Sequence, residues 1–150
     1  MHSAAKTADP SGAQDRLLQL PPVIVYMKSD PFEKLPDAFI EPLESFLAWL
    51  ELERGLSKNT LLAYTRDLAQ CVEFLAKEGV DDWSMVESAH LSAWTASLSR
   101  ADFARSSQAR KLSALRMLAK HLVRENVRKD DVTELLGAPK LLRKLPDVLT

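Results

Sequence analysis

Apolar residues recur every three to four positions from Phe39 onward, the spacing that places side chains on one face of an α-helix. This pattern predicts four helices and a short helical turn, at about 41–53, 58–78, 89–99, 106–125 and 130–136. The positions expected to be buried are Leu43, Phe46, Leu47, Leu50, Leu61, Tyr64, Leu68, Cys71, Val72, Leu75, Leu91, Trp94, Leu98, Leu112, Leu115, Leu118, Ala119 and Leu122. No strand pairing and no long repeat is evident, so we expect an all-α, compact four-helix bundle with one core.

Capping and breaking residues mark where the first two helices begin and end. Pro42 is expected in the first turn of the first helix, where its missing N–H group is tolerated. Gly55 ends this helix, Ser57 caps the second helix, and Gly79 closes it.

The two ends of the chain differ in composition from the helical part. Residues 1–36 are small, polar and turn-rich apart from one β-prone run at 21–28, so we expect an extended or largely disordered N-terminal tail. Residues 37–138 are predicted to form the helical domain. Residues 139–150 are basic and bracketed by prolines, which indicates a linker.

Charge is distributed unevenly along the chain, although the 150 residues have a formal net charge of only -1. Residues 37–99 contain four basic and eleven acidic residues and so carry -7. Residues 100–150 contain twelve basic and six acidic residues and carry +6. An asymmetry of this size favours an anionic partner for the basic half.

The sequence does not indicate a catalytic or metal site. His2, His90 and His121 are scattered, with His121 expected on the polar side of the fourth helix. Cys71 is the single cysteine, has no metal-ligand spacing around it, and is expected to be a small core residue. Glycine-rich phosphate loops and hydrolase motifs are missing. We therefore predict no catalytic residue, no metal, no cofactor and no small-molecule ligand.

A membrane partner is not expected either. No apolar run approaches the roughly 20 residues that cross a bilayer, and the N-terminus lacks a signal-peptide pattern. These observations predict a cytoplasmic protein.

Basic and hydroxylated side chains gather at the start of the second helix and along the fourth. At about 100° per residue, the fourth helix places one polar set opposite its leucine stripe. This set is Arg110, Ser113, Arg116, Lys120 and His121. Lys111 falls near the stripe, and its amine is expected to reach solvent. Helix N-termini with cations and hydroxyls suit phosphate, but the same residues are ordinary on a solvated face, so composition leaves both interpretations open.

Three blocks carry a family resemblance: ERGLSKNTLLAYTRDL, RKLSALR and DDVTELLGAPKLLRKLPDVLT. In this order they resemble the N-terminal core-binding domain of bacterial tyrosine recombinases of the Xer type, from about Phe39 to Thr150. The last block is more similar to the XerD branch. The resemblance implies a SAM-like helical domain that grips a DNA recombination half-site, while a separate C-terminal domain exchanges strands through a tyrosine.

The resemblance also implies partners and DNA-facing residues. The partners are a double-stranded recombination site and other recombinase subunits in a tetramer, for either chromosome dimer resolution and segregation or integration. The chain is then a fragment or isolated domain, inactive alone. The implied DNA-binding residues lie on the second helix, the fourth helix and the linker: Ser57, Lys58, Asn59, Thr60, Arg66, Arg105, Ser106, Ser107, Arg110, Ser113, Arg116, Lys120, Lys140, Arg143 and Lys144.

Two other functions are also considered for this sequence. A stand-alone helical protein–protein module would dock a basic partner on its acidic first half and would show no salt-sensitive DNA binding. An enzyme complete within this chain would cleave DNA strands by itself, which the missing catalytic constellation argues against.

Overall fold

The computed structural model describes residues 30–136. These residues form four α-helices and one 3-10 turn: α4 (Asp37–Leu52), α5 (Lys58–Lys77), η1 (Trp83–Met85), α6 (Ser88–Arg100) and α7 (Arg105–Arg124). The described part contains no strand, so the predicted all-α class is confirmed there. None of its helices is long and apolar enough to span a membrane.

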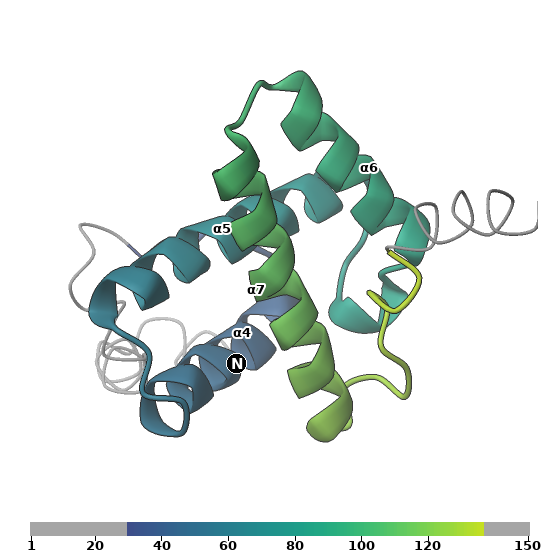
Figure 1. The fold of residues 1–150 in the computed structure, drawn as a ribbon. Helices are drawn as coiled ribbons and strands as arrows, with labels where there is room; N and C mark the ends of the chain where they lie inside the picture. The colour runs from purple at the N-terminus through teal and green to yellow at the C-terminus, as the bar shows by residue number, and fades with distance from the viewer. Residues whose placement is uncertain (1–29, 137–150) are drawn as a thin grey trace, which may run out of the picture.

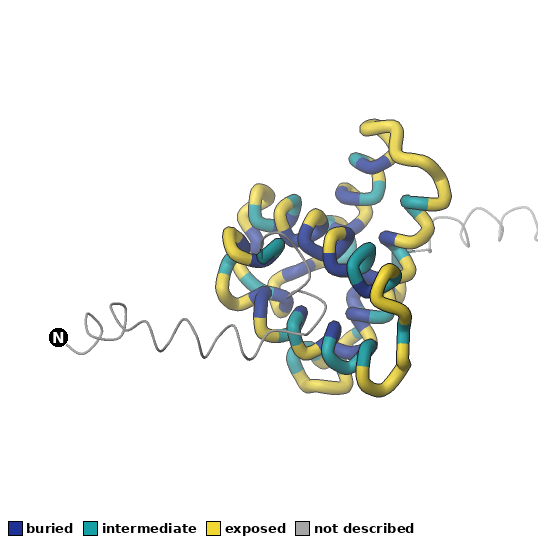
Figure 2. Tube along the Cα trace, turned by 90° about the vertical axis from the view of Figure 1, so that its left-hand side faces the viewer, coloured by how far each residue is buried: buried dark blue, intermediate teal, exposed yellow. Residues whose placement is uncertain are grey.

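Helix α7 lies across the bundle and holds it together (Figure 1). It packs most extensively against α5 and also contacts α4 and α6, while α5 contacts α4. The buried residues face the interior of this arrangement, and the exposed residues follow the outer sides of the helices (Figure 2). One continuous apolar core therefore joins all four helices.

The predicted core positions are buried, with two exceptions at its edge. Tyr64 and Leu112 are half-buried. Trp83 adds a large side chain that closes the α5–α6 connection: its Nε1 donates to the carbonyl oxygen of Phe39 at 3.2 Å, and the two rings meet edge-on with centroids 5.0 Å apart. The Trp83 indole can be buried without leaving an unpaired donor, because its N–H is hydrogen-bonded to Phe39.

Helix α4 begins earlier than predicted. It starts at Asp37 instead of residue 41, and Pro42 therefore lies inside the helix and not in its first turn. The missing N–H of Pro42 removes one helical hydrogen bond. Phe39 and Ile40 are buried in the core, and their packing stabilises the additional N-terminal turn. Local propensity alone does not reveal this contribution.

The other helix ends follow the sequence signals. Gly55 and Gly79 adopt φ angles of 61° and 87°, the left-handed conformation that ends a helix at low cost for glycine. Ser57 is the N-cap of α5, where its Oγ accepts a hydrogen bond from the backbone N–H of Thr60 at 3.2 Å. These predicted boundaries are confirmed.

The segments that flank the bundle also contribute to its core. Residues 31–34 form turns, as their composition indicates, but Phe32 and Leu35 are buried, so the packed core extends into the segment assigned to the N-terminal tail. The helical turn predicted at 130–136 is a pair of hydrogen-bonded turns and not an α-helix. Its Asp131 side chain accepts from the backbone N–H of Thr133 at 2.8 Å. Residues 1–29 of the predicted N-terminal tail and the whole predicted linker at 139–150 lie outside the described residues.

Candidate nucleic-acid interface

The start of α5 combines a closed local cap with exposed polar side chains. Ser57 Oγ accepts from the Thr60 N–H and donates to Thr60 Oγ1 at 2.9 Å. Both hydroxyl groups therefore serve helix initiation. Lys58, Asn59 and Arg66 are exposed. The cations at this end of α5 are therefore exposed, and the hydroxyl groups of Ser57 and Thr60 are hydrogen-bonded to each other.

The start of α7 differs because no side chain caps it. Its N-cap residue is Ala104, and its first turn contains no acidic residue. Arg105 and Ser106 are exposed there, and Ser107 is half-buried. First-turn backbone N–H groups have no acceptor within their own helix, and the positive end of the helix dipole attracts anions. This end of α7 is therefore electropositive and has no acidic first-turn side chain to offset it.

A buried carboxylate joins α5 to two cations of α7. Asp67 is 1% exposed, and its Oδ2 accepts from Arg110 Nε at 2.8 Å while its Oδ1 accepts from Arg110 Nη2 at 2.9 Å. Lys111 Nζ donates to the same Oδ1 at 2.8 Å. The hydrogen bond that Arg110 donates to Asp67 raises the pKa of Arg110, so this guanidinium stays charged. Arg110 was predicted to face outward, and it does so only in part because Asp67 holds one edge of it.

The prediction that the amine of Lys111 reaches solvent is wrong. Lys111 is 3% exposed, and its Nζ also donates to Gln70 Oε1 at 2.6 Å and lies 4.8 Å from the ring centroid of Phe103. The helical wheel placed this side chain correctly beside the apolar stripe. The negative charge that allows Lys111 to be buried is Asp67 on α5, and the residue pattern of α7 alone gives no information about it.

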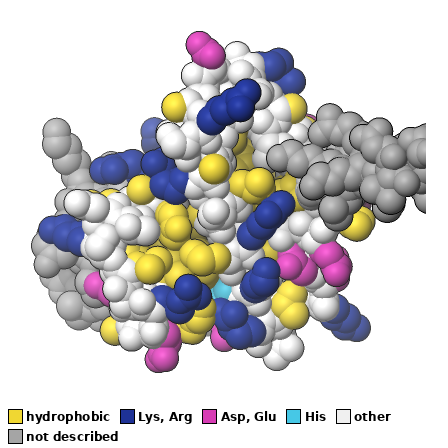
Figure 3. All heavy atoms as spheres, viewed as in Figure 1, with side chains coloured by type: hydrophobic (Ala, Val, Ile, Leu, Met, Phe, Trp, Pro, Cys, Tyr) yellow, Lys and Arg dark blue, Asp and Glu magenta, His cyan; other side chains and the backbone are white. Residues whose placement is uncertain are grey.

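The middle of α7 presents the predicted polar arc. Ser113, Arg116 and Lys120 are exposed, and among residues 30–136 neither Arg116 nor Lys120 forms an ion pair. Figure 3 shows this side of the molecule: Lys and Arg side chains lie along α5 and α7 around an apolar area, and Asp and Glu side chains lie towards the edges. The arrangement provides separated cations on one face, which suits a polyanion better than a single small anion.

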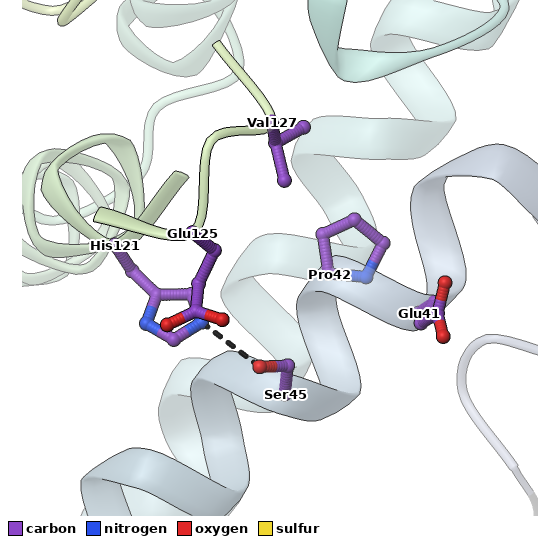
Figure 4. Close-up of a pocket in the computed structure, with 6 residues that line it drawn as sticks. All are labelled: Glu41, Pro42, Ser45, His121, Glu125 and Val127. Atoms are coloured by element: carbon purple, nitrogen blue, oxygen red, sulfur yellow. Dashed lines mark hydrogen bonds between the residues drawn. The ribbon is translucent and has the colours of Figure 1, made fainter. Parts of the chain in front are cut away.

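His121 departs from the predicted polar arc. It is 2% exposed, and its Nε2 lies 3.0 Å from Ser45 Oγ on α4 (Figure 4). Arg124 Nη2 lies 3.3 Å from His121 Nδ1. A guanidinium can only donate, so Nδ1 is the acceptor and Nε2 carries the proton that is donated to Ser45. The prediction is wrong because α4 covers the side of α7 that carries His121.

Burial favours the neutral imidazole at this position. It lowers the pKa of His121; the charge of Glu125 opposes the shift and that of Arg124 adds to it. Figure 4 shows His121 and Ser45 pointing toward each other among the residues that line a pocket. The pocket is lined by Glu41, Pro42, Ser45, His121, Glu125 and Val127. Both ring nitrogens of this histidine are engaged within the protein, by Ser45 and by Arg124.

Sequence reasoning also missed an aromatic cluster beside this histidine. The guanidinium carbon of Arg124 lies 4.2 Å from the ring centroid of Trp49, and the centroid of His121 lies 5.9 Å from it. Trp49 also stacks on Phe46 with centroids 6.4 Å apart. The i, i+3 spacing places Phe46 and Trp49 on one face of α4, and His121 and Arg124 on one face of α7. The spacing does not reveal that these two faces pack against each other.

Cys71 is fully buried, and burial raises the pKa of its thiol, as expected for a core residue. Within residues 30–136 no cluster of His, Cys, Asp or Glu could hold a metal ion. Lys140, Arg143 and Lys144 lie outside the described residues.

Comparison with known proteins identifies the family. Residues 43–126 match the model of the phage integrase N-terminal SAM-like domain, and the chain belongs to this family. It is 40% identical over 108 residues to tyrosine recombinase XerD of Brucella suis, a match that covers 72% of this chain and 35% of that protein. It is 39% identical over 108 residues to XerD of Agrobacterium fabrum, covering 72% and 32%.

A XerC protein is also among the relatives. Tyrosine recombinase XerC of Herpetosiphon aurantiacus is 36% identical over 110 residues, covering 73% of this chain and 36% of that protein. The resemblance to Xer-type tyrosine recombinases is therefore confirmed, as is the SAM-like all-α fold, while the XerD branch stays a prediction. The chain spans about a third of the length of the curated relatives it matches.

Proposed function

We propose that this chain is the DNA-gripping domain of a site-specific tyrosine recombinase and that α5 and α7 face the phosphate backbone. Strand exchange belongs, in this proposal, to a catalytic domain joined through the basic segment 139–150, with Lys140, Arg143 and Lys144 passing along the duplex. The helical domain at 37–138 supplies the grip. The parent protein then acts as a tetramer on a recombination site in the cytoplasm, in chromosome dimer resolution or in integration.

The observation that carries this proposal is the exposed basic face shared by α5 and α7. Lys58 and Arg66 on α5 and Arg105, Arg116 and Lys120 on α7 are all exposed. Cations separated along two crossing helices can each displace a condensed counterion from a duplex, and this release drives binding. The uncapped start of α7 adds backbone N–H groups for a phosphate oxygen. The family relationship supports the same conclusion.

Salt dependence of DNA binding tests the placement of the interface. Affinity of the chain for a short fluorescein-labelled duplex is measured by fluorescence anisotropy across a series of KCl concentrations. Arg116→Ala and Lys120→Ala should each weaken binding and reduce the slope of log K against log salt by about 0.9, the value for one lost phosphate contact.

A matched control removes the same charge elsewhere. Lys34 is exposed in the turn before α4, on neither of the two helices. Lys34→Ala should leave the slope close to that of the unmodified chain. Equal slopes for Arg116→Ala, Lys120→Ala and the unmodified chain would exclude this face as the interface, and binding without salt dependence would contradict the proposed function itself.

A further inference from the structure

We propose that Asp67 is a positioning residue that orients Arg110 for a second two-point contact, made to a pair of acceptor atoms on duplex DNA. This inference rests on the proposed function. In it Asp67 holds the inner edge of the guanidinium, and the outer edge meets the DNA. Asp67 itself is buried and does not touch the duplex.

The geometry of the Arg110 side chain leaves that outer edge available. Asp67 engages Nε and Nη2, at 2.8 and 2.9 Å. A guanidinium has five N–H donors, so three remain, on Nη1 and Nη2. The side chain of Arg110 is 41% exposed whereas that of Asp67 is 1% exposed. The buried carboxylate therefore occupies the Nε/Nη2 edge, and the remaining donors lie on the other edges of this partly exposed guanidinium.

The third member of the cluster decides its net charge. An Asp67–Arg110 pair alone would be neutral and would attract DNA weakly. Lys111 adds a second positive charge to the same carboxylate, at 2.8 Å, and is itself only 3% exposed. One negative and two positive charges leave a net +1, and Arg110 is the exposed cation of the three. The buried amine thus balances Asp67 so that Arg110 keeps its attraction for an anionic partner.

Arg110 differs in this respect from the other exposed cations of α7. Arg116 has no ion pair among residues 30–136, so ordering it on DNA costs side-chain entropy. Asp67 already fixes the plane and direction of the Arg110 guanidinium, so this side chain loses less conformational entropy when it binds DNA. A planar fork fits two acceptors side by side, either guanine O6 and N7 in the major groove or two phosphate oxygens.

A double-mutant cycle separates positioning from a purely structural role. Asp67→Asn with Lys111→Met removes one negative and one positive charge, so the net charge of the chain does not change. This pair of changes is introduced with Arg110 present and in the Arg110→Ala background. If Asp67 acts through Arg110, duplex affinity falls roughly tenfold when Arg110 is present and hardly at all when it has been replaced. Equal losses in both backgrounds, or no loss in either, would overturn the proposal.

Arg110→Lys provides a second variant at a site that is not buried. It keeps the charge but lacks the planar fork, so affinity should fall nearly as far as in Arg110→Ala. Binding of Arg110→Lys equal to that of the unmodified chain would also overturn the proposal. Circular dichroism of each variant checks that it is folded, which keeps the cycle interpretable.

The source of the acceptors is resolved by changing the DNA. In a duplex with 7-deazaguanine in place of guanine, the N7 acceptor is gone. Loss of affinity on this duplex for the unmodified chain, but not for Arg110→Ala, assigns the contact to guanine. No loss for either, together with a salt slope lowered by about 0.9 in Arg110→Ala, assigns it to phosphate. Both outcomes support a contact between Arg110 and the duplex, and coupling in the double-mutant cycle is what assigns the positioning to Asp67.

Failure of this inference differs from failure of the proposed function. If Arg116→Ala lowers the salt slope but the cycle shows no coupling, α5 and α7 bind DNA without positioning of Arg110 by Asp67. If the chain shows no salt-dependent duplex binding at all, the proposed function fails first.

Discussion

The two ends of α7 handle buried polar side chains in opposite ways. Near its N-terminus, Arg110 and Lys111 share the carboxylate of Asp67 on α5. Near its C-terminus, His121 is buried against α4 and, among residues 30–136, forms no ion pair with a carboxylate, and Arg124 covers the ring of Trp49. One end therefore balances charge with charge, and the other keeps the buried group neutral and places the charge over an aromatic face.

The comparison shows where the bundle is most sensitive to substitution. A buried ion that loses its partner is left without solvent or counter-charge, which costs several kcal/mol. Removing a partner of a neutral histidine, or the aromatic ring beneath a cation, costs much less free energy of folding. Three substitutions rank the two ends, beginning with the largest expected effect.

Asp67→Ala should have the largest effect on stability. It leaves the buried Lys111 amine without its counter-charge and close to the Arg110 cation; among residues 30–136 its remaining partners are Gln70 Oε1 and the Phe103 ring. We expect the free energy of unfolding to fall by about 3–5 kcal/mol, measured by urea denaturation followed by circular dichroism. Glu73→Ala, an exposed position on the same helix, is the control and should change stability by about 0.5 kcal/mol or less. Similar losses for both variants would show that the buried charge is not the cause.

Trp49→Ala should have an intermediate effect at the other end of α7. It removes the surface on which Phe46, His121 and Arg124 pack. Because the indole is only half-buried, we expect a loss of about 2 kcal/mol, below the range for fully buried aromatic residues. Leu52→Ala, 78% exposed on the same helix, is the matched control and should be nearly neutral. A loss as large as that of Asp67→Ala would reverse the ranking of the two ends.

His121→Gln should have the smallest effect, visible only as a change in pH dependence. The folded protein holds the pKa of His121 below its unfolded value, chiefly through burial. The unfolded state therefore binds more protons once the pH falls below about 6.5, and the stability of the unmodified chain decreases there. The glutamine variant lacks this contribution. Thermal unfolding of both proteins is measured at pH values above and below about 6.5. As the pH falls, the melting temperature of the unmodified chain should decrease more than that of His121→Gln, and parallel curves would contradict this prediction.

Much of the bundle was predictable because the apolar period is a local property. Leu43, Leu47 and Leu50 repeat at helical spacing along α4 and all lie in the core. Gly55 and Ser57 mark a helix end and a helix start through their own backbone and side-chain chemistry. The three sequence blocks likewise indicated the recombinase family before any geometry was known.

The candidate site was predictable only in part. Arg116 and Lys120 were expected on the exposed arc of α7 and are exposed. Lys111 and His121 were expected to reach solvent and are buried. A helical wheel describes one helix, whereas burial depends on which neighbouring helix covers each side of it.

The sequence by itself determined the helices, the apolar core, the family and the excess of cations in the second half of the chain. Only the tertiary structure decided which cations are paired and which ionisable groups are buried. Asp67 and Arg110 are 43 positions apart, and Ser45 and His121 are 76 apart. The physical reason is that the free energy of a charge depends on its solvent exposure and counter-charges, and here both are supplied by distant segments that folding brings together.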